Sequence, residues 1–339
     1  MNKQHLVSIC IPTYKRPQEL KRALNSIDTK YINDVDIVIS ENCSVLQDET
    51  RKVVEDFKRD SPFEVIYKEQ LENVGYDRNI QTIVQLADGD FLVFLSDDDV
   101  FIPNTLDVYI DFIRNHKEYG YILRSYRHVY SDGSTQDFRY YKEDRVFPAG
   151  DDTYIEMFDR SIFLSGFTIK SEPAKRFYTD KLDGSLLYQL YLLAEVCRIY
   201  PSAYCHTIIT QSYEGGTPFF GDSKVEKELY QSGINPIENS LNFMRWYNVV
   251  IDLIADKYHN DTNIRLRHYM SKYSYGYLKS QRKAGLKTFN EYARQLRKMG
   301  FGASPYFYVY YIALLLLGEN RCDKTISLLK RIVGHRPQL

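Results

Sequence analysis

The sequence lacks the signatures of several common protein classes. Its 339 residues include one Trp and five cysteines, and the cysteines form no CxxC pair. This spacing argues against a disulfide framework or a zinc site and favours a reducing, cytoplasmic setting. Residues 1–7 do not show a charged region followed by a long apolar region, so we expect no signal peptide. No apolar run reaches the roughly 18 residues that a membrane span needs.

Glycine-rich phosphate-binding loops are missing as well. The N-terminal half contains neither GxGxxG nor GxxxxGK[ST]. We therefore expect neither a dinucleotide-binding fold of the usual type nor a P-loop. A nucleotide bound to this chain would be held by side chains and a metal ion instead.

Charge is distributed unevenly along the chain. The net charge is −1, but residues 262–339 contain 15 Lys or Arg against 3 Asp or Glu, a net of +12 that leaves −13 for residues 1–261. The basic region predicts a polyanionic neighbour, either a phosphate-rich ligand or an anionic membrane surface. No RNA- or DNA-binding motif accompanies it, so we do not expect nucleic acid as the partner.

Apolar runs of strand length alternate with helical patterns through the first hundred residues. This alternation predicts parallel βαβ units. The expected strands are 6–11, 35–40, 63–67 and 91–95, and the expected helices are 17–27, 48–58 and 76–86. A further strand is expected at 121–130, followed by a hairpin turn at 131–134. Only helical patterns follow residue 236, at 241–258, 264–279 and 289–299, so we expect an α/β domain at 1–235 and a helical region at 236–339.

Three consecutive carboxylates, Asp97, Asp98 and Asp99, follow the buried strand 91–95. In open α/β sheets, ligands lie outside the carboxyl ends of the strands. Three acids at that position repel one another unless a cation neutralises them. Oxygen ligands beside phosphates suit Mg²⁺ or Mn²⁺. The alternative is a solvated acidic turn that caps a helix starting near Thr105.

Four segments, in order, resemble the motifs of family 2 glycosyltransferases: residues 7–16, 39–44, 73–79 and 87–99. The resemblance implies a GT-A fold, a nucleoside diphosphate sugar as donor, with UDP or CDP favoured, and a divalent metal. It places Pro12, Thr13 and Tyr14 along the base pocket, Glu41 against the base or ribose, and Arg78 near the base or diphosphate. Asp97 would face the ribose, and Asp98 and Asp99 would hold the metal. The remaining nucleotide-binding positions are Arg16, Asn73 and Gly75.

An inverting transfer needs a carboxylate that accepts the proton of the acceptor hydroxyl. Asp183 lies where the family places this base, and Asp180 and Glu195 are the alternatives. Asp183 would also suit the N-cap of a helix at 185–196, and a retaining reaction would remove its role as base. His206 is a candidate third metal ligand, although a lone His is more often an ordinary surface or core residue. Residues 161–170 either face the donor sugar or form an ordinary strand.

The segment 305–317 is apolar and aromatic but too short to span a membrane. It suits a helix lying on a membrane surface, a buried helix, or a contact between copies of the chain. The resemblance extends to bacterial O-antigen and capsule sugar transferases. It implies a saccharide acceptor linked to lipid, with the protein in the cytoplasm or at the inner face of the membrane. The alternative functions are a nucleotidyltransferase and a protein that binds nucleic acid or another polyanion through the basic C-terminal region.

Overall fold

The computed structural model describes residues 5–216, 219–231 and 237–333, with side chains up to residue 326. The chain divides into two compact units, residues 1–234 and 235–339. The boundary expected after residue 235 lies outside the described residues. All five cysteines are unpaired, as expected.

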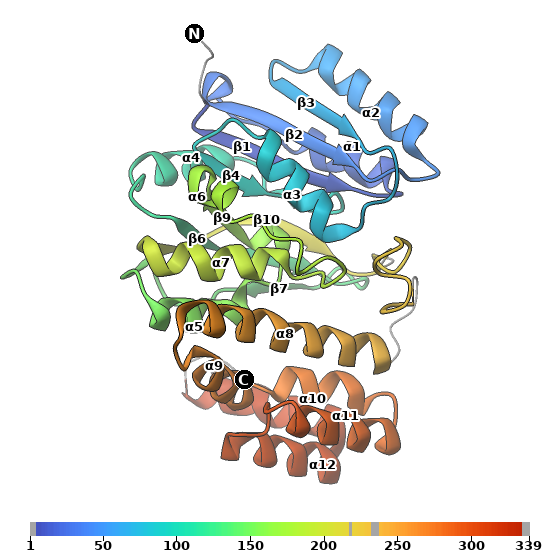
Figure 1. Cartoon of the computed structure of the whole chain (residues 1–339), viewed down its shortest axis with the longest axis vertical. Helices are drawn as coiled ribbons and strands as arrows, with labels where there is room; N and C mark the ends of the chain where they lie inside the picture. The colour runs from blue at the N-terminus through green and yellow to red at the C-terminus, as the bar shows by residue number, and fades with distance from the viewer. Residues whose placement is uncertain (1–4, 217–218, 232–236, 334–339) are drawn as a thin grey trace. The chain divides into compact units, whose positions relative to one another are not determined.

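Unit 1 is built on a ten-stranded mixed sheet in the order β3-β2-β1-β4-β9-β6-β10-β5, with β7 and β8 paired to β6 and β10 (Figure 1). Its first half confirms the expected βαβ units, because all four strands run parallel. The strands are β1 (Val7–Thr13), β2 (Val35–Glu41), β3 (Glu64–Glu69) and β4 (Phe91–Phe94), and the helices are α1 (Pro17–Asn25), α2 (Gln47–Asp60) and α3 (Tyr76–Leu86).

The second half of the sheet is mostly antiparallel. Strand β9 (Phe167–Lys170) lies between β4 and β6 (Tyr121–Val129) and runs antiparallel to both. The hairpin expected at 131–134 joins β6 to its antiparallel partner β7, with Gly133 at φ +81°. The other elements are β5 (Val100–Phe101), β7 (Thr135–Phe138), β8 (Arg145–Phe147), β10 (Ser202–Tyr213), α4 (Leu106–Arg114), α5 (Asp151–Phe158), α6 (Ser171–Arg176) and α7 (Tyr188–Ile199).

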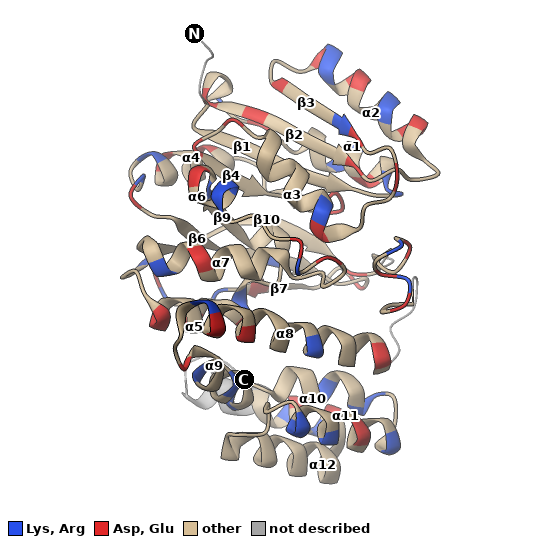
Figure 2. Ribbon diagram, viewed as in Figure 1, with Lys and Arg blue, Asp and Glu red and all other residues tan. Residues whose placement is uncertain are grey.

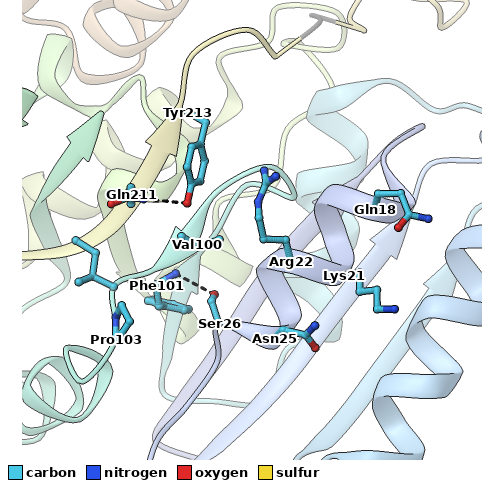
Figure 3. A pocket seen from close by; sticks show the side chains of 11 residues that line it. Gln18, Lys21, Arg22, Asn25, Ser26, Val100, Phe101, Pro103, Gln211 and Tyr213 are labelled. Atoms are coloured by element: carbon cyan, nitrogen blue, oxygen red, sulfur yellow. Dashed lines mark hydrogen bonds between the residues drawn. The ribbon is translucent and has the colours of Figure 1, made fainter. Parts of the chain in front are cut away.

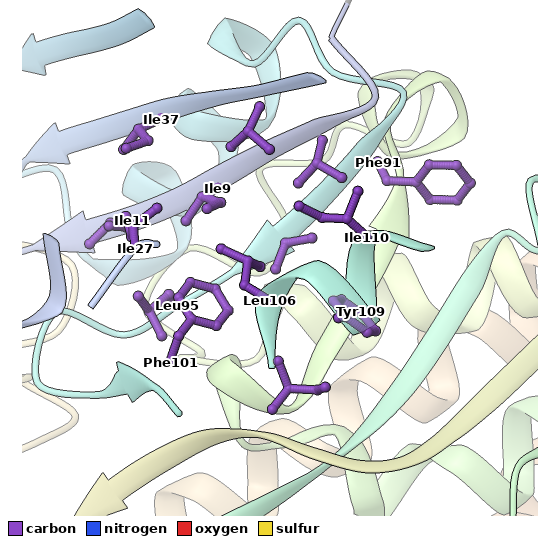
Figure 4. Close-up of a cluster of buried hydrophobic side chains, with 14 of the residues drawn as sticks. Ile9, Ile11, Ile27, Ile37, Phe91, Leu95, Phe101, Leu106, Tyr109 and Ile110 are labelled. Carbon is purple, nitrogen blue, oxygen red and sulfur yellow. The ribbon is translucent and has the colours of Figure 1, made fainter. Parts of the chain in front are cut away.

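Helices cover both faces of the parallel strands. Ile9 and Ile11, alternate residues of β1, belong to one buried cluster with Leu20 of α1 and Leu106 of α4. Figure 4 shows Ile9, Ile11 and Leu106 within this cluster. Helices α3, α6 and α7 lie on the opposite face (Figure 1). Strands covered on both faces read as continuous apolar runs, which is why the first strands could be located from the sequence.

Strand β1 continues through Pro12, where we expected it to end. Pro12 pairs in register with Ser40 of β2. The backbone groups of Cys10 face β4, because the Leu95 amide donates to the Cys10 carbonyl. Backbone groups two residues apart in a strand point to the same side, so the nitrogen of Pro12 also points toward the β4 side. Strand β4 ends at Phe94, which pairs with Cys10, and therefore offers Pro12 no partner. The missing N–H removes no ladder hydrogen bond there.

Unit 2 is helical throughout its described residues. Its helices are α8 (Ile237–Tyr258), α9 (Thr262–Lys272), α10 (Tyr275–Arg282), α11 (Leu286–Lys298) and α12 (Pro305–Val333), the last interrupted at Gly318 with φ +71°. The single helix expected at 264–279 was wrong, because α9 ends and α10 begins around Ser274, whose hydroxyl donates to the Ser271 carbonyl. Basic residues concentrate on α9 to α11, while α12 is largely uncharged in its first half (Figure 2).

Candidate active site

The three acids that follow β4 occupy different environments. Asp97 and Asp99 are buried, at 5% and 3% exposure, whereas the Asp98 side chain is 29% exposed. Burial raises the pKa of Asp97 to about 6, with Arg16 opposing the shift and Asp98 adding to it. Burial and the charge of Asp98 raise the pKa of Asp99 to about 8, against a hydrogen bond from Ser165. Asp98 is therefore the most accessible of the three carboxylates.

Arg16 bridges two of these acids. Its Nη1 lies 2.9 Å from Asp97 Oδ1 and 2.8 Å from Asp98 Oδ2. The Tyr14 amide donates to Asp97 Oδ2 at 3.2 Å. Asp97 is thus tied to the end of β1, and Arg16 neutralises part of the charge of the acidic turn.

Ser165 supports the third acid. Its Oγ donates to Asp99 Oδ2 at 2.5 Å and accepts from the Ser96 amide at 2.8 Å. Residues 161–166 form short 3₁₀ turns, and only Phe167–Lys170 is a strand. The segment 161–170 therefore contacts the acidic turn through Ser165, and its expected position against the donor sugar stays a prediction.

The carboxyl ends of β1 and β2 bring together the residues expected around the base. Thr13 pairs in register with Glu41, and Glu41 is fully buried. Its Oε1 accepts from the Ser44 amide at 2.9 Å, while Oε2 has no hydrogen-bond partner among the described residues. An unpartnered buried carboxylate oxygen is costly unless a ligand donates to it.

The segment before α3 is held by side-chain hydrogen bonds. Asn73 Oδ1 accepts from Asn42 Nδ2 at 2.9 Å and from the Gly75 amide at 3.0 Å. Gly75 has φ +84°, a conformation that favours glycine. The Tyr76 amide donates to Glu226 at 2.7 Å. Asn73 and Gly75 thus shape the start of α3, which carries Arg78.

Arg78 and Asp183 form an ion pair. The Nε and Nη2 atoms of Arg78 lie 2.6 and 2.5 Å from Asp183 Oδ2. Asp183 Oδ1 is buried and has no hydrogen-bond partner among the described residues. Of the alternative bases, Asp180 is exposed and Glu195 is fully buried in α7, so a substrate hydroxyl cannot reach Glu195.

Asp183 does not cap the helix that follows it. Helix α7 begins at Tyr188, and the amides of Leu186, Leu187 and Tyr188 donate to Asp77 on α3 at 3.0 to 3.1 Å. Sequence reasoning assigned no role to Asp77. A cap supplied by a residue more than a hundred positions away leaves no local signal, because N-caps are recognised from the residue adjoining the helix.

A cleft of about 580 Å³ opens beside the acidic turn. It contains Asp98 and Asp99 and an aromatic wall from β6, β7 and neighbouring segments. Its lining is Ser96, Asp98, Asp99, Tyr126, His128, Tyr130, Phe138, Phe163, Ser212, Tyr213, Glu214, Gly215 and Gly216. Arg78 and Asp183 are not among these residues.

The histidine in this cleft is His128, whose Nδ1 lies 2.9 Å from Ser212 Oγ. The candidate His206 instead lies beside Asp144 and the Tyr204 ring, outside the lining. Within the described part of the chain, no group of three or more His, Cys, Asp or Glu residues is arranged around a metal position. Asp98 and Asp99 offer two carboxylates, which fits Mg²⁺ or Mn²⁺, since such ions complete their shell with water and substrate phosphates.

Residues 8–167 match the model of glycosyl transferase family 2. This match spans just under half of the 339 residues. The abequosyltransferase RfbV of Salmonella typhimurium is 31% identical over 170 residues, 47% of each chain. The GalNAc(5)-diNAcBac-PP-undecaprenol beta-1,3-glucosyltransferase of Campylobacter jejuni is 29% identical over 100 residues, 30% of this chain and 32% of its own length. The chain thus spans less than half the length of these curated relatives.

Solved structures extend the likeness in fold beyond residues 8–167. The structure of S. aureus TarS 1–349 has a TM-score of 0.59 at 12% identity. The match covers 94% of this chain and 91% of the TarS chain. The same protein in complex with UDP-GlcNAc gives a TM-score of 0.58. The expected GT-A-like architecture with a helical C-terminal region is confirmed.

Proposed function

We propose that the chain is a glycosyltransferase that moves one sugar from a nucleoside diphosphate sugar to a hydroxyl group of a saccharide. The observation that carries this function is the acidic turn Asp97–Asp99 at the carboxyl end of β4, beside a 580 Å³ cleft and inside the segment that matches the family 2 model. Relatives named as sugar transferases support it. Structures of TarS with UDP and with UDP-GlcNAc support a nucleotide-sugar donor.

In this proposal Asp98 and Asp99 hold a divalent metal, Mn²⁺ or Mg²⁺. Both line the cleft, and Asp98 is accessible. When bound, such an ion offsets the charge that develops on the leaving diphosphate. Arg16 keeps Asp97 and Asp98 together by pairing with both.

The nucleoside would lie against Pro12, Thr13, Tyr14 and Glu41. The unpartnered Glu41 Oε2 supplies a buried acceptor for an N–H of the base or a ribose hydroxyl. Pyrimidine bases carry such donors, in keeping with UDP or CDP as the donor nucleotide. Arg78 would lie near the base or diphosphate, at the start of α3.

We assign Asp183 as the base of an inverting transfer. It would accept the proton of the acceptor hydroxyl while that oxygen bonds to the sugar and the bond to the diphosphate breaks. The Asp183 side chain is 11% exposed, whereas Glu195 is fully buried. Arg78 pairs with Asp183 Oδ2, and Oδ1 has no hydrogen-bond partner among the described residues.

The acceptor we propose is a lipid-linked saccharide of a bacterial surface polysaccharide, such as O-antigen or capsule. The printed names of the two curated relatives support this class, one being an abequosyltransferase and the other acting on a PP-undecaprenol saccharide. A cytoplasmic enzyme at the inner membrane face would meet such an acceptor.

Helix α12 supports a peripheral contact with an anionic membrane. Val309, Ile312 and Leu316 are 59%, 51% and 74% exposed and share one side of the helix. The opposite side is buried in unit 2. At the flanks, Lys272 lies 6.0 Å from the Tyr306 ring and Arg297 lies 5.6 Å from the Tyr308 ring. Apolar side chains bordered by tyrosines and cations suit a membrane interface.

Among the helices of the described residues, none combines the length and the hydropathy that a membrane span requires.

The first test is isothermal titration with UDP, CDP, GDP and dTDP, each with and without Mn²⁺. We expect one nucleotide to bind tightly only with the metal. The Asp98→Asn variant should weaken this binding by roughly tenfold or more, because it removes a charged metal ligand. Asp88→Asn, the same change at the exposed amino end of β4, is the matched control and should bind like the wild type. If no nucleotide binds under any condition, the proposed function fails.

A further inference from the structure

A second cleft, of about 520 Å³, lies between α1 and the strands β5 and β10 (Figure 3). One wall is the exposed face of α1, where Gln18, Lys21, Arg22 and Asn25 follow the three- and four-residue spacing of one helix side. The rest of the lining is Ser26, Val100, Phe101, Ile102, Pro103, Gln211 and Tyr213.

This lining contains two cations and no carboxylate. Neither Lys21 nor Arg22 forms an ion pair with an acid among the described residues, whereas Arg16, Arg51 and most other arginines of unit 1 do. The side-chain amides of Gln18, Asn25 and Gln211 add N–H donors. The absence of carboxylates from this lining contrasts with the net charge of −13 over residues 1–261. A donor-rich, acid-free cleft in an acidic unit favours an oxyanion.

Arg22 links this cleft to the candidate active site. Its Nη2 donates to the backbone carbonyl of Asp98 at 2.8 Å. Its guanidinium also lies 4.8 Å from the ring of Tyr213. These two contacts fix the guanidinium and leave it other N–H groups for a ligand. Tyr213 lines both clefts, so one extended ligand can reach from the acids into the basic cleft.

We propose that the cleft lined by Lys21 and Arg22 binds a phosphate group carried by the acceptor. The inference rests on the proposed function, which places the metal and the diphosphate of the donor at Asp98 and Asp99 and brings the reacting hydroxyl to the donor sugar. Lys21 and Arg22 then bind the phosphate at a fixed distance from that hydroxyl. Phosphorylated saccharides become acceptors, and their neutral counterparts bind poorly.

The first experiment titrates sodium pyrophosphate into the full chain in EDTA, where the metal-free acids of the donor site repel an anion. We expect saturable binding. Lys21→Gln/Arg22→Gln should weaken it by roughly tenfold or more, because charged hydrogen bonds are lost. Lys52→Gln/Lys58→Gln removes two cations from an exposed side of α2 and is the matched control, with wild-type affinity expected.

The second experiment measures sugar transfer. Pyrophosphate should compete with the phosphorylated acceptor, and Lys21→Gln should raise the KM for that acceptor with the KM for the donor unchanged. Lys21→Arg, which keeps the charge, should restore the wild-type value. A neutral acceptor should be insensitive to Lys21→Gln, which separates acceptor-borne phosphate from free phosphate.

Three results would overturn the inference: no pyrophosphate binding, an equal loss in both double variants, or competition with the donor in place of the acceptor. The pyrophosphate titration needs no nucleotide. A failure of nucleotide binding therefore refutes the proposed function separately from this site.

Discussion

Asp77 shows how a single buried carboxylate organises the site from a distance. It accepts hydrogen bonds from three amides at the start of α7 and from the Ser185 hydroxyl at 3.1 Å. Burial raises its pKa to about 7, with the backbone hydrogen bonds opposing the shift. The residue thereby positions the loop that carries Asp183.

This pKa predicts a pH-dependent stability. An unfolded Asp titrates near pH ~4, so between about pH 4 and pH 7 the folded chain holds a proton that the unfolded chain has lost. Stability therefore falls across that window as pH rises, by up to roughly 1.4 kcal/mol per unit, and levels off above it. Asp77→Asn removes this slope.

Urea denaturation of the wild type and Asp77→Asn at pH 5 and pH 8 measures the effect. The variant loses an ionisable acceptor, so it should be the less stable protein at pH 5, and the gap should narrow at pH 8. A gap that is independent of pH would contradict the raised pKa.

Asp183 gives a second prediction that concerns a single residue. Asp183→Asn should lower kcat by about 10² to 10⁴, the usual contribution of a general base, while the nucleotide Kd stays unchanged. The measurement is transfer from a labelled donor to a membrane lipid extract. Asp180→Asn, at an exposed neighbouring acid, serves as the control. Equal losses in the two variants would refute Asp183 as the base.

Among the elements, the segment 219–231 is attached to the site through several side chains, of which Glu226 is buried. Glu226 is buried, and its two carboxylate oxygens accept from the Tyr76 amide at 2.7 Å and the Gly221 amide at 3.0 Å. The same segment supplies Asp222, which lies 2.5 Å from Lys15 Nζ. The sequence patterns assigned this segment no role.

Glu226→Gln should loosen this attachment. One oxygen would become an NH₂ group facing an amide donor, so one buried N–H would lose its partner, at a cost of roughly 1–3 kcal/mol. Limited proteolysis should cut between Tyr213 and Gln231 faster in the variant, and thermal denaturation gives the stability. Glu228→Gln, at an exposed acid of the same segment, should behave like the wild type. Unchanged cleavage would show that other contacts hold the segment.

For the whole molecule, the basic helical unit predicts binding to anionic membranes. Vesicles containing phosphatidylglycerol should sediment the protein, and neutral phosphatidylcholine vesicles should not. Binding should weaken as salt rises, because charge attraction is screened within about 10 Å at 0.1 M.

Leu316→Glu places a charge on the exposed side of α12 and should reduce sedimentation severalfold. Ile264→Glu alters an apolar residue that is 68% exposed on α9 and is the control. If Leu316→Glu instead changes the mass measured by light scattering without vesicles, the α12 face is a contact between copies of the chain.

The sequence by itself determined the parallel half of the sheet, the acidic turn and the helical C-terminal region. Buried strands such as β1 and β4 are continuous apolar runs, and Asp97, Asp98 and Asp99 follow one of them directly, so both signals are local. Only the tertiary structure decided which distant groups meet these residues. Arg16 on the acids, Ser165 on Asp99, Asp77 at the start of α7 and Arg78 on Asp183 all join positions far apart in the chain. Such pairings depend on how the strands and helices pack, which periodicity and spacing along one chain do not encode.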